Sequence, residues 1–219
     1  MTQETPYPHR YLIPDDEASA EISVRNSVFI GTVCPAPTIE AAHNAVAQVR
    51  QRYPDANHNA WAFVISGGPS AVIGSSDDGE PGGTAGRPML AVLEGHGLLQ
   101  AVAIGTRYFG GTKLGTGGLV RAYSDCVRAA LKGLPLAEMV FHHRASITVD
   151  YGLYGTLKYA LPKQGVVLDD EIFGESVSLS LLIPPSELQA VGILLSNMTS
   201  GQIQIERSLD GGHYVKSTL

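Results

Sequence analysis

The chain has 219 residues, a formal net charge of -6 and charged residues at 16% of its positions. These values exclude a protein whose whole surface is basic and coats nucleic acid, although a local basic patch is still allowed. The length suits two small domains. No apolar run approaches the roughly 20 residues of a membrane helix and the N-terminus lacks a signal pattern, so we expect a cytoplasmic protein without membrane contact.

The first part of the chain alternates strand and helix signals. Residues 1–20 are rich in proline and charge, which predicts a loose N-terminal lead. A strand is expected within Glu21–Val33, and Thr38 is placed to cap the helix that follows. Two short strands are then predicted at Trp61–Ile65 and Ala71–Gly74.

An aperiodic segment, Ser75–Arg87, leads from these strands to a short helix whose expected first residue is Pro88. Connections longer than about 12 residues inside a compact domain are uncommon and are often functional. The carboxylates Asp77, Asp78 and Glu80 in this acidic loop have two interpretations. They form a divalent-metal or acid/base site, or they cap helix N–H groups, which we favour because their spacing lacks an EF-hand register.

The stretch Arg107–Arg121 is rich in glycine and lies between an apolar strand, Ala101–Ile104, and a helical pattern. Glycine lets the backbone approach a ligand closely, and the free N–H groups of a helix start attract anions. We therefore predict a phosphate or other anion site; the alternative is a tight reversal between two packed elements. The residues expected to bind the ligand are Arg87, Arg107, Gly110, Gly111, Lys113, Gly115, Gly117, Gly118 and Arg121.

The glycine spacing matches no standard nucleotide fingerprint. Thr116 and Gly117 stand where a P-loop needs lysine and then serine or threonine, and Val120 replaces the third glycine of the dinucleotide motif. The two cysteines, Cys34 and Cys126, are not spaced as zinc ligands. We therefore predict neither a cofactor nor a metal.

A second pattern begins after Pro135. It reads strand, helix, strand, strand, helix, strand, with the strands at Ala145–Val149, Val166–Leu168, Val177–Ile183 and around Ile203 and Ile205. This βαββαβ order is ferredoxin-like. We therefore predict an α+β protein with domains at 21–136 and 137–219 and a frayed tail after Ser208.

Three segments resemble the IMPACT/YigZ family: Asp55–Phe63, Ser76–Leu90 and Arg107–Tyr123. The last two are long and specific, and the layout is similar to that of a bacterial two-domain member. The resemblance implies an N-terminal domain similar to one in a small-subunit ribosomal protein and in domain IV of elongation factor G. It implies a C-terminal domain similar to domain V of that factor. For bacterial members it supplies no settled reaction, and binding of nucleic acid or the ribosome is inferred from fold analogy.

The first of these segments departs from the family pattern. Where relatives commonly carry a cysteine and an arginine, this chain has Ala60 and Val64. A nucleophilic cysteine is therefore excluded at this position, and one phosphate contact of the family is lost.

Two functions are consistent with these features. The first is a cytoplasmic regulatory or binding protein, related to translation, that recognises phosphate-rich targets, either RNA or the ribosome. A protein partner stays open, and sequence-specific reading of DNA is not expected. The alternative is an enzyme acting on a small phosphorylated or peptide-like substrate in a cleft between two glycine-rich loops. Its catalytic residues would be His58, Asp78, Glu80 and Lys113.

Overall fold

The computed structural model describes residues 10–66, 71–205 and 209–218. It contains helices and antiparallel sheets, as predicted for an α+β protein, and divides into two units. The N-terminal unit comprises Met1–Glu138 with Ser217–Leu219, and the C-terminal unit comprises Met139–Lys216. The boundary was predicted after residue 136, and the division after Glu138 also falls inside strand β7 (Leu136–Val149).

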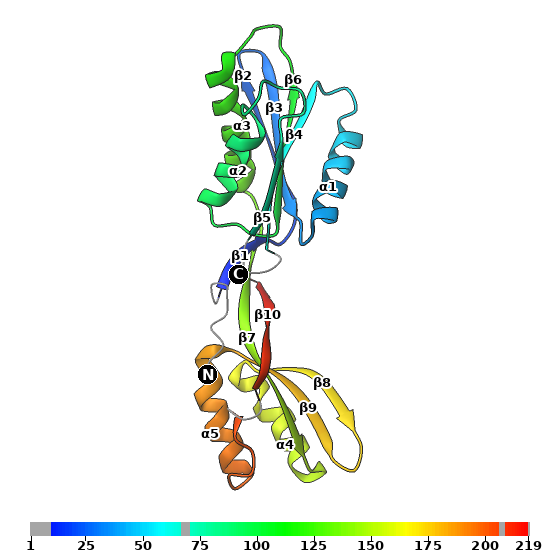
Figure 1. Cartoon of the computed structure of the whole chain (residues 1–219), viewed down its shortest axis with the longest axis vertical. Coiled ribbons are helices and arrows are strands. Elements are labelled where there is room, and N and C mark those ends of the chain that lie inside the picture. Colours follow the sequence, from blue (N-terminus) through cyan, green and yellow to red (C-terminus); the bar gives the residue numbers. More distant parts are fainter. Residues whose placement is uncertain (1–9, 67–70, 206–208, 219) are drawn as a thin grey trace. The chain divides into compact units, whose positions relative to one another are not determined.

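The N-terminal unit is built on an antiparallel sheet with the strand order β2-β3-β6-β4-β5. Helix α1 covers one face, and α2 and α3 cover the other (Figure 1). The elements are β1 (Arg10–Pro14), β2 (Ala18–Val24), β3 (Ser27–Pro35), α1 (Ile39–Arg52), β4 (His58–Ser66), β5 (Ala71–Ser76), α2 (Gly86–Gly95), β6 (Ala101–Tyr108) and α3 (Gly115–Leu131).

Alternating side chains of the central strands supply a core on each face of this sheet. Along β6, Ala101 and Ala103 pack with α2 and α3, whereas Val102 and Ile104 pack with α1. Neighbouring side chains of a strand point to opposite faces, so a continuous apolar run is what a strand buried on both sides requires.

The C-terminal unit has the predicted order of strands and helices, with α4 and α5 packed on one face of its sheet. Strands β7, β9 and β8 are neighbours in that order, and β10 pairs with β7. The elements after β7 are α4 (Tyr151–Ala160), β8 (Val167–Phe173), β9 (Val177–Ile183), α5 (Leu188–Met198) and β10 (Leu209–Thr218), with short 3-10 turns at Pro162–Gln164 and Pro185–Glu187. None of the helices that the structure describes has the length and apolar composition needed to cross a membrane.

Three expectations about elements were wrong, and a fourth, the strand within 21–33, was incomplete. The loose lead is wrong for residues 10–20, which form β1 and part of β2; residues 1–9 lie outside the described residues. The strand expected within 21–33 is a hairpin of β2 and β3. Its turn is made by Arg25 and Asn26, whose φ angles of 45° and 68° are unusual for residues other than glycine.

The other two errors concern a helix start and the last strand. Helix α2 begins at Gly86, two positions before Pro88, because a carboxylate described below caps it there. The final strand is not formed by Ile203 and Ile205. It is β10, in the part of the chain expected to be a frayed tail, and pairing with β7 orders it.

Candidate anion-binding site

The three family-like segments meet at one end of the sheet of the N-terminal unit. There β6 ends, β4 begins and β5 ends, because β4 is antiparallel to both neighbours. The Tyr108 hydroxyl donates to an Asp55 carboxylate oxygen at 2.9 Å, and the Phe109 N–H donates to Asn57 Oδ1 at 2.7 Å. The segment before β4 therefore braces the start of the glycine-rich loop.

A buried ion pair joins the acidic loop to the elements on both sides of the glycine-rich loop. Glu80 Oε1 accepts from the Arg107 guanidinium at 2.7 Å and from the Tyr123 hydroxyl at 2.8 Å. The side chains of Glu80 and Arg107 are only 3% and 7% exposed. Burial, and then the neighbouring Glu80 carboxylate, raise the pKa of the Tyr123 phenol, which therefore stays protonated and donates.

Aromatic rings enclose the cation of this pair. Arg107 Cζ lies 5.3 Å from the ring centroids of both Phe29 and Phe109. Arg107 Nε is buried without a hydrogen-bond partner among the described residues, so the carboxylate of Glu80 is the main compensation for the buried charge. This placement argues against Arg107 as a contact for an external anion, although the sequence made it a candidate.

Asp77 fills the start of α2. Its carboxylate accepts from the backbone N–H groups of Gly83 at 2.7 Å and of Ala85 and Gly86 at 2.9 Å each. Burial alone would raise the pKa of Asp77. The three N–H groups together, with Arg87 nearby, hold that pKa below its ordinary value of 3.8. The favoured interpretation of this carboxylate, a helix cap, therefore agrees with the structure.

Asp78 and Glu80 are also held by structural contacts, but neither caps a helix start, so the capping interpretation is wrong for these two. The Asp78 carboxylate accepts from the Asn59 N–H at 2.7 Å and pairs with Arg50 at 2.6 Å. His58 Nδ1 lies 2.8 Å from the carbonyl oxygen of Asp78, so it is the protonated ring nitrogen and donates. The backbone of Asp78 has a φ of 47°, a strained value that these contacts hold in place.

The alternative catalytic set is not assembled as a site. His58 and Asp78 are in contact, but Glu80 is buried on Arg107 and Tyr123. Lys113 is exposed and makes no hydrogen bond or ion pair with a described residue. Within the described residues, no group of histidine, cysteine and acidic side chains is arranged to hold a metal ion.

The first part of the glycine-rich loop is shaped by packing. A Cβ atom on Gly110 would lie 1.9 Å from the backbone oxygen of Asn26, so only glycine fits against the β2–β3 turn. The Gly110 N–H donates to Ser27 Oγ at 3.1 Å. Gly111 has a φ of 83°, which favours glycine, but its Cβ position faces open space. At Gly110 the tight-reversal interpretation therefore applies.

The second part of the loop leads into α3, whose start has no side-chain cap. Gly115 has a φ of 73° and begins the helix, so Gly117 and Gly118 belong to its first turn. The residue before it, Leu114, provides no side-chain cap, and the first turn contains no acidic residue. The N–H groups of the turn therefore receive no carboxylate from the described part of the chain.

Exposed cations lie along this open turn. Lys113 precedes the helix and Arg121 lies just after its first turn, and neither has a hydrogen bond or ion pair with a described residue. Arg87, the third exposed cation of the predicted set, is at the start of α2, where it lowers the pKa of Asp77. Of the predicted ligand-binding side chains, Lys113 and Arg121 are therefore the best placed for an external anion.

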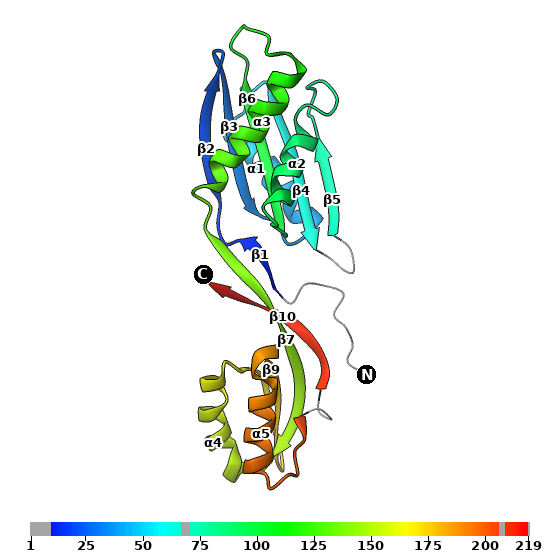
Figure 2. The same cartoon turned by 90° about the vertical axis from the view of Figure 1, so that its left-hand side faces the viewer.

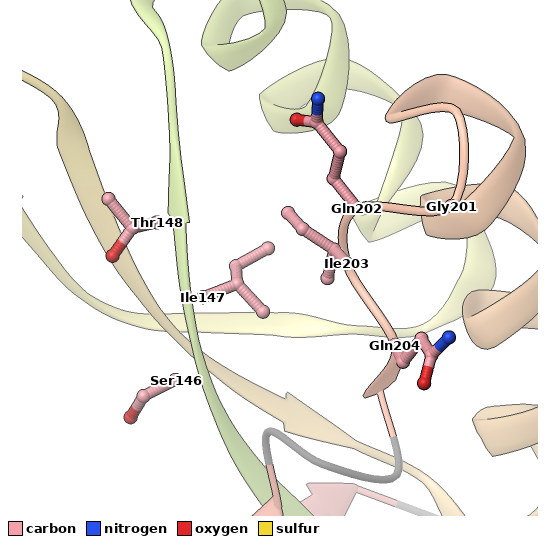
Figure 3. A pocket seen from close by; sticks show the side chains of 7 residues that line it. All are labelled: Ser146, Ile147, Thr148, Gly201, Gln202, Ile203 and Gln204. Carbon is pink, nitrogen blue, oxygen red and sulfur yellow. The ribbon is translucent and has the colours of Figure 1, made fainter.

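Two hollows of the described chain lie away from this site. One hollow, of about 220 Å³, lies in the C-terminal unit between β7 and residues 201–204. Figure 3 shows Ile147 and Ile203 facing each other there, while the amides of Gln202 and Gln204 point away, so no polar groups converge on a ligand. A second hollow lies at the other end of the N-terminal sheet, near the start of β6. Neither is lined by the glycine-rich loop.

The cysteines do not supply a nucleophile. Both are buried, and burial raises the pKa of the Cys34 thiol to about 12 and that of the Cys126 thiol to about 12. A thiol with so high a pKa is protonated and inert at neutral pH.

Sequence reasoning missed several residues that build the site. Tyr123 was named only as the last residue of a family-like segment, although its hydroxyl donates to the Glu80 carboxylate that pairs with Arg107. Arg50, the partner of Asp78, lies in α1, and Asn57 braces Phe109. The usable signal was the presence of three family-like segments in one chain, which come together although they are far apart in sequence.

The fold and site define a class: an α+β protein of two units, with an exposed glycine-rich helix start at one end of its N-terminal sheet. Residues 25–131 match the model of the Impact N-terminal domain, and residues 147–202 match that of a domain of unknown function, DUF1949. The chain belongs to the IMPACT family.

The relatives match along most of their length. An IMPACT family member of Haemophilus influenzae is 35% identical and covers 90% of this chain and 96% of its own. IMPACT family member YigZ of Escherichia coli is 33% identical, with coverage of 89% and 96%. A crystal structure described only as that of a hypothetical protein has 29% identity and a TM-score of 0.66, and it covers 97% of this chain and 98% of that chain.

Proposed function

We propose that this protein is a cytoplasmic, translation-related binding protein that recognises phosphate-rich targets, RNA or the ribosome, through the start of α3. One observation carries the proposal. The first turn of α3 has no carboxylate from the described chain and lies beside Lys113 and Arg121, two exposed cations without an ion pair. Backbone N–H groups at a helix start, together with lysine and arginine, are a standard arrangement for phosphate.

The geometry favours a large target over a small substrate. The acidic loop that would complete an enzyme site is occupied by its own contacts, and neither hollow described above adjoins the glycine-rich loop. An exposed helix start with two exposed cations can contact a sugar–phosphate backbone without enclosing it. We also propose that the two units are similar to domains IV and V of elongation factor G. Superposition of each unit on that factor tests this similarity.

The test compares two double variants on the same helix. Lys113→Ala with Arg121→Ala removes the proposed contacts, and Arg128→Ala with Lys132→Ala removes the same charge near the end of α3. Binding of a fluorescein-labelled single-stranded RNA is measured by anisotropy at several salt concentrations, and binding to purified ribosomes by co-sedimentation. The first variant is expected to weaken RNA binding at least about tenfold and to lower the salt slope by about 1.4, because each single-strand phosphate contact contributes about 0.7.

The matched variant is expected to change the affinity by less than about threefold, which corresponds to roughly 0.6 kcal/mol. Equal RNA affinity and an unchanged salt slope in the Lys113/Arg121 variant, together with undiminished ribosome binding, would refute the proposed site.

A further inference from the structure

The strand β5 forms an open edge of the N-terminal sheet. It pairs with β4 on one side, and no described strand pairs with its other side (Figure 2). An edge strand directs unpaired N–H and C=O groups outward, and proteins usually protect such edges with charges, proline or bulges.

Two other edge strands that the structure describes, one in each sheet, carry such protection. The edge strand β2 contains Glu21, and β8 contains Asp169 and Asp170 with a register shift between Leu168 and Asp170. The sequence of β5, Ala-Val-Ile-Gly-Ser-Ser, has no charge and no proline. β5 is therefore the least protected of these edges.

Apolar side chains are exposed along this edge. Ile73 is 52% exposed and Val72 is 43% exposed, and they project from opposite faces of the strand. β-branched residues in an unprotected edge favour the addition of another strand. An added strand would extend the five-stranded sheet and cover both side chains.

A hollow of about 520 Å³ adjoins the same edge. Ala71 and Ile73 of β5 line it together with Val64 of the neighbouring strand. Leu12 and Leu98 complete an apolar floor. The hollow is therefore placed to take an apolar side chain of a strand paired with β5, since alternate side chains of that strand would point to this face.

Two carboxylates, those of Glu94 and Glu138, line the hollow together with the Arg10 guanidinium. Glu94 is exposed and has no ion pair with a described residue. The partner of Glu138 is Arg10, which lies 3.7 Å away with a side chain that is 72% exposed, so this pair is weak. A lysine or arginine of an incoming segment would find a carboxylate in the hollow.

We propose that β5 and this hollow bind an extended segment of a protein partner that alternates apolar and basic residues and adds to the sheet as a further strand. Main-chain hydrogen bonds to β5 give affinity, and the apolar pocket with its two carboxylates gives specificity. The site is at the opposite end of β6 from the start of α3, because the hollow includes Leu98 and Leu99, just before that strand begins. The proposal does not rest on RNA binding.

The test uses a synthetic six-residue peptide of alternating valine and lysine, the length of β5, with a fluorescent label. Its binding to the full chain is measured by anisotropy, and protection of the β5 amides by hydrogen exchange. Ile73→Lys places a charge on the exposed edge without touching the buried core, and Val120→Lys, at an exposed apolar position on α3, is the matched control. A valine–glutamate peptide tests the charge preference.

The expected result is binding that falls at least about tenfold in Ile73→Lys, a loss of roughly 1.4 kcal/mol, and stays unchanged in Val120→Lys. The acidic peptide is expected to bind at least about tenfold more weakly, and the β5 amides become protected only with the basic peptide. No binding, equal binding to the Ile73 variant, or equal binding of the acidic peptide would overturn the proposal. Sedimentation analysis that shows a dimer lost in Ile73→Lys would also overturn it, because a second copy would then cover the edge.

Discussion

The starts of α2 and α3 lie in the same unit and both follow glycine-rich segments, yet they differ in one respect. At the start of α2 the Asp77 carboxylate accepts from three backbone N–H groups, so a side chain of the protein is the anion bound there. At α3 no described carboxylate does so, and Lys113 and Arg121 lie beside the open turn. Glycine alone therefore does not identify a ligand site; what distinguishes the two helix starts is whether an internal carboxylate already occupies the N–H groups.

The largest effect is expected from removing the Glu80 carboxylate, which joins the acidic loop to Arg107 and Tyr123. Glu80→Ala leaves the Arg107 charge buried and the Tyr123 hydroxyl without its acceptor. Removing one partner of a buried ion pair typically costs about 3 to 5 kcal/mol. The free energy of unfolding, measured by urea denaturation, is expected to fall by this amount.

Asp125→Ala is the matched control for that variant. Its carboxylate pairs with Arg128 at 2.9 Å on the surface of α3, with both side chains about half exposed. Such a pair is worth no more than about 0.5 kcal/mol. A loss below about 1 kcal/mol in Glu80→Ala would show that the pair does not hold the loops together.

A smaller effect is expected from removing the charge that fills the start of α2. Asp77→Asn keeps the shape of the side chain but weakens its bonds to Gly83, Ala85 and Gly86, and we expect a loss of about 2 kcal/mol at neutral pH. The folded protein lowers the pKa of Asp77 from 3.8, so its contribution is complete above that value. It is lost as the pH falls through the lower folded-state pKa.

Urea denaturation of the wild type and of Asp77→Asn at acid pH tests whether the stabilisation by Asp77 is lost as the pH falls. The difference in unfolding free energy should be constant above pH 3.8 and shrink below it. Thr38→Ala, which removes a single neutral cap bond of 3.0 Å from α1, is the control and should cost about 1 kcal/mol at every pH. A difference for Asp77→Asn that grows on acidification would contradict the assigned direction of the pKa shift.

The smallest effect is expected from adding a carboxylate to the first turn of α3, which contains no acidic residue. Thr116 is exposed in the first turn of α3, and Thr116→Glu adds a carboxylate where the helix dipole favours it. We expect a gain of about 0.5 kcal/mol in the unfolding free energy at low salt and weaker RNA binding. Gln48→Glu adds the same charge to the exposed side of α1, and the comparison fails if both variants lose RNA affinity equally.

Local patterns made several elements predictable. The Thr38 cap and apolar spacing located α1, and strict alternation located β9 at its observed bounds. Both depend on neighbours in sequence, which is the information that periodicity and capping rules use. The turn of Arg25 and Asn26 was not predicted because neither residue is a glycine, although both have positive φ.

The sequence did not show which candidate residues make structural contacts and which are free for the proposed ligand. Arg107 was assigned to the ligand because it begins the glycine-rich stretch, yet Glu80 and two aromatic rings bury it. Tyr123 reaches Glu80 across a separation of 43 residues, and no spacing rule predicts such a contact. The glycines at the start of α3 could be read from adjacent residues, but whether a distant carboxylate fills that start, as Asp77 does at α2, could not.

The two buried cysteines have a practical consequence for chemical labelling. Cys34 lies in the core beside α1 and Cys126 in the core beside α3, and the pKa of each thiol is about 12. Reagents that need a thiolate should leave both unmodified in the folded chain. A cysteine substituted for Lys113 would then be the one reactive thiol, so the natural sequence is a ready background for attaching a cross-linker at the open helix start.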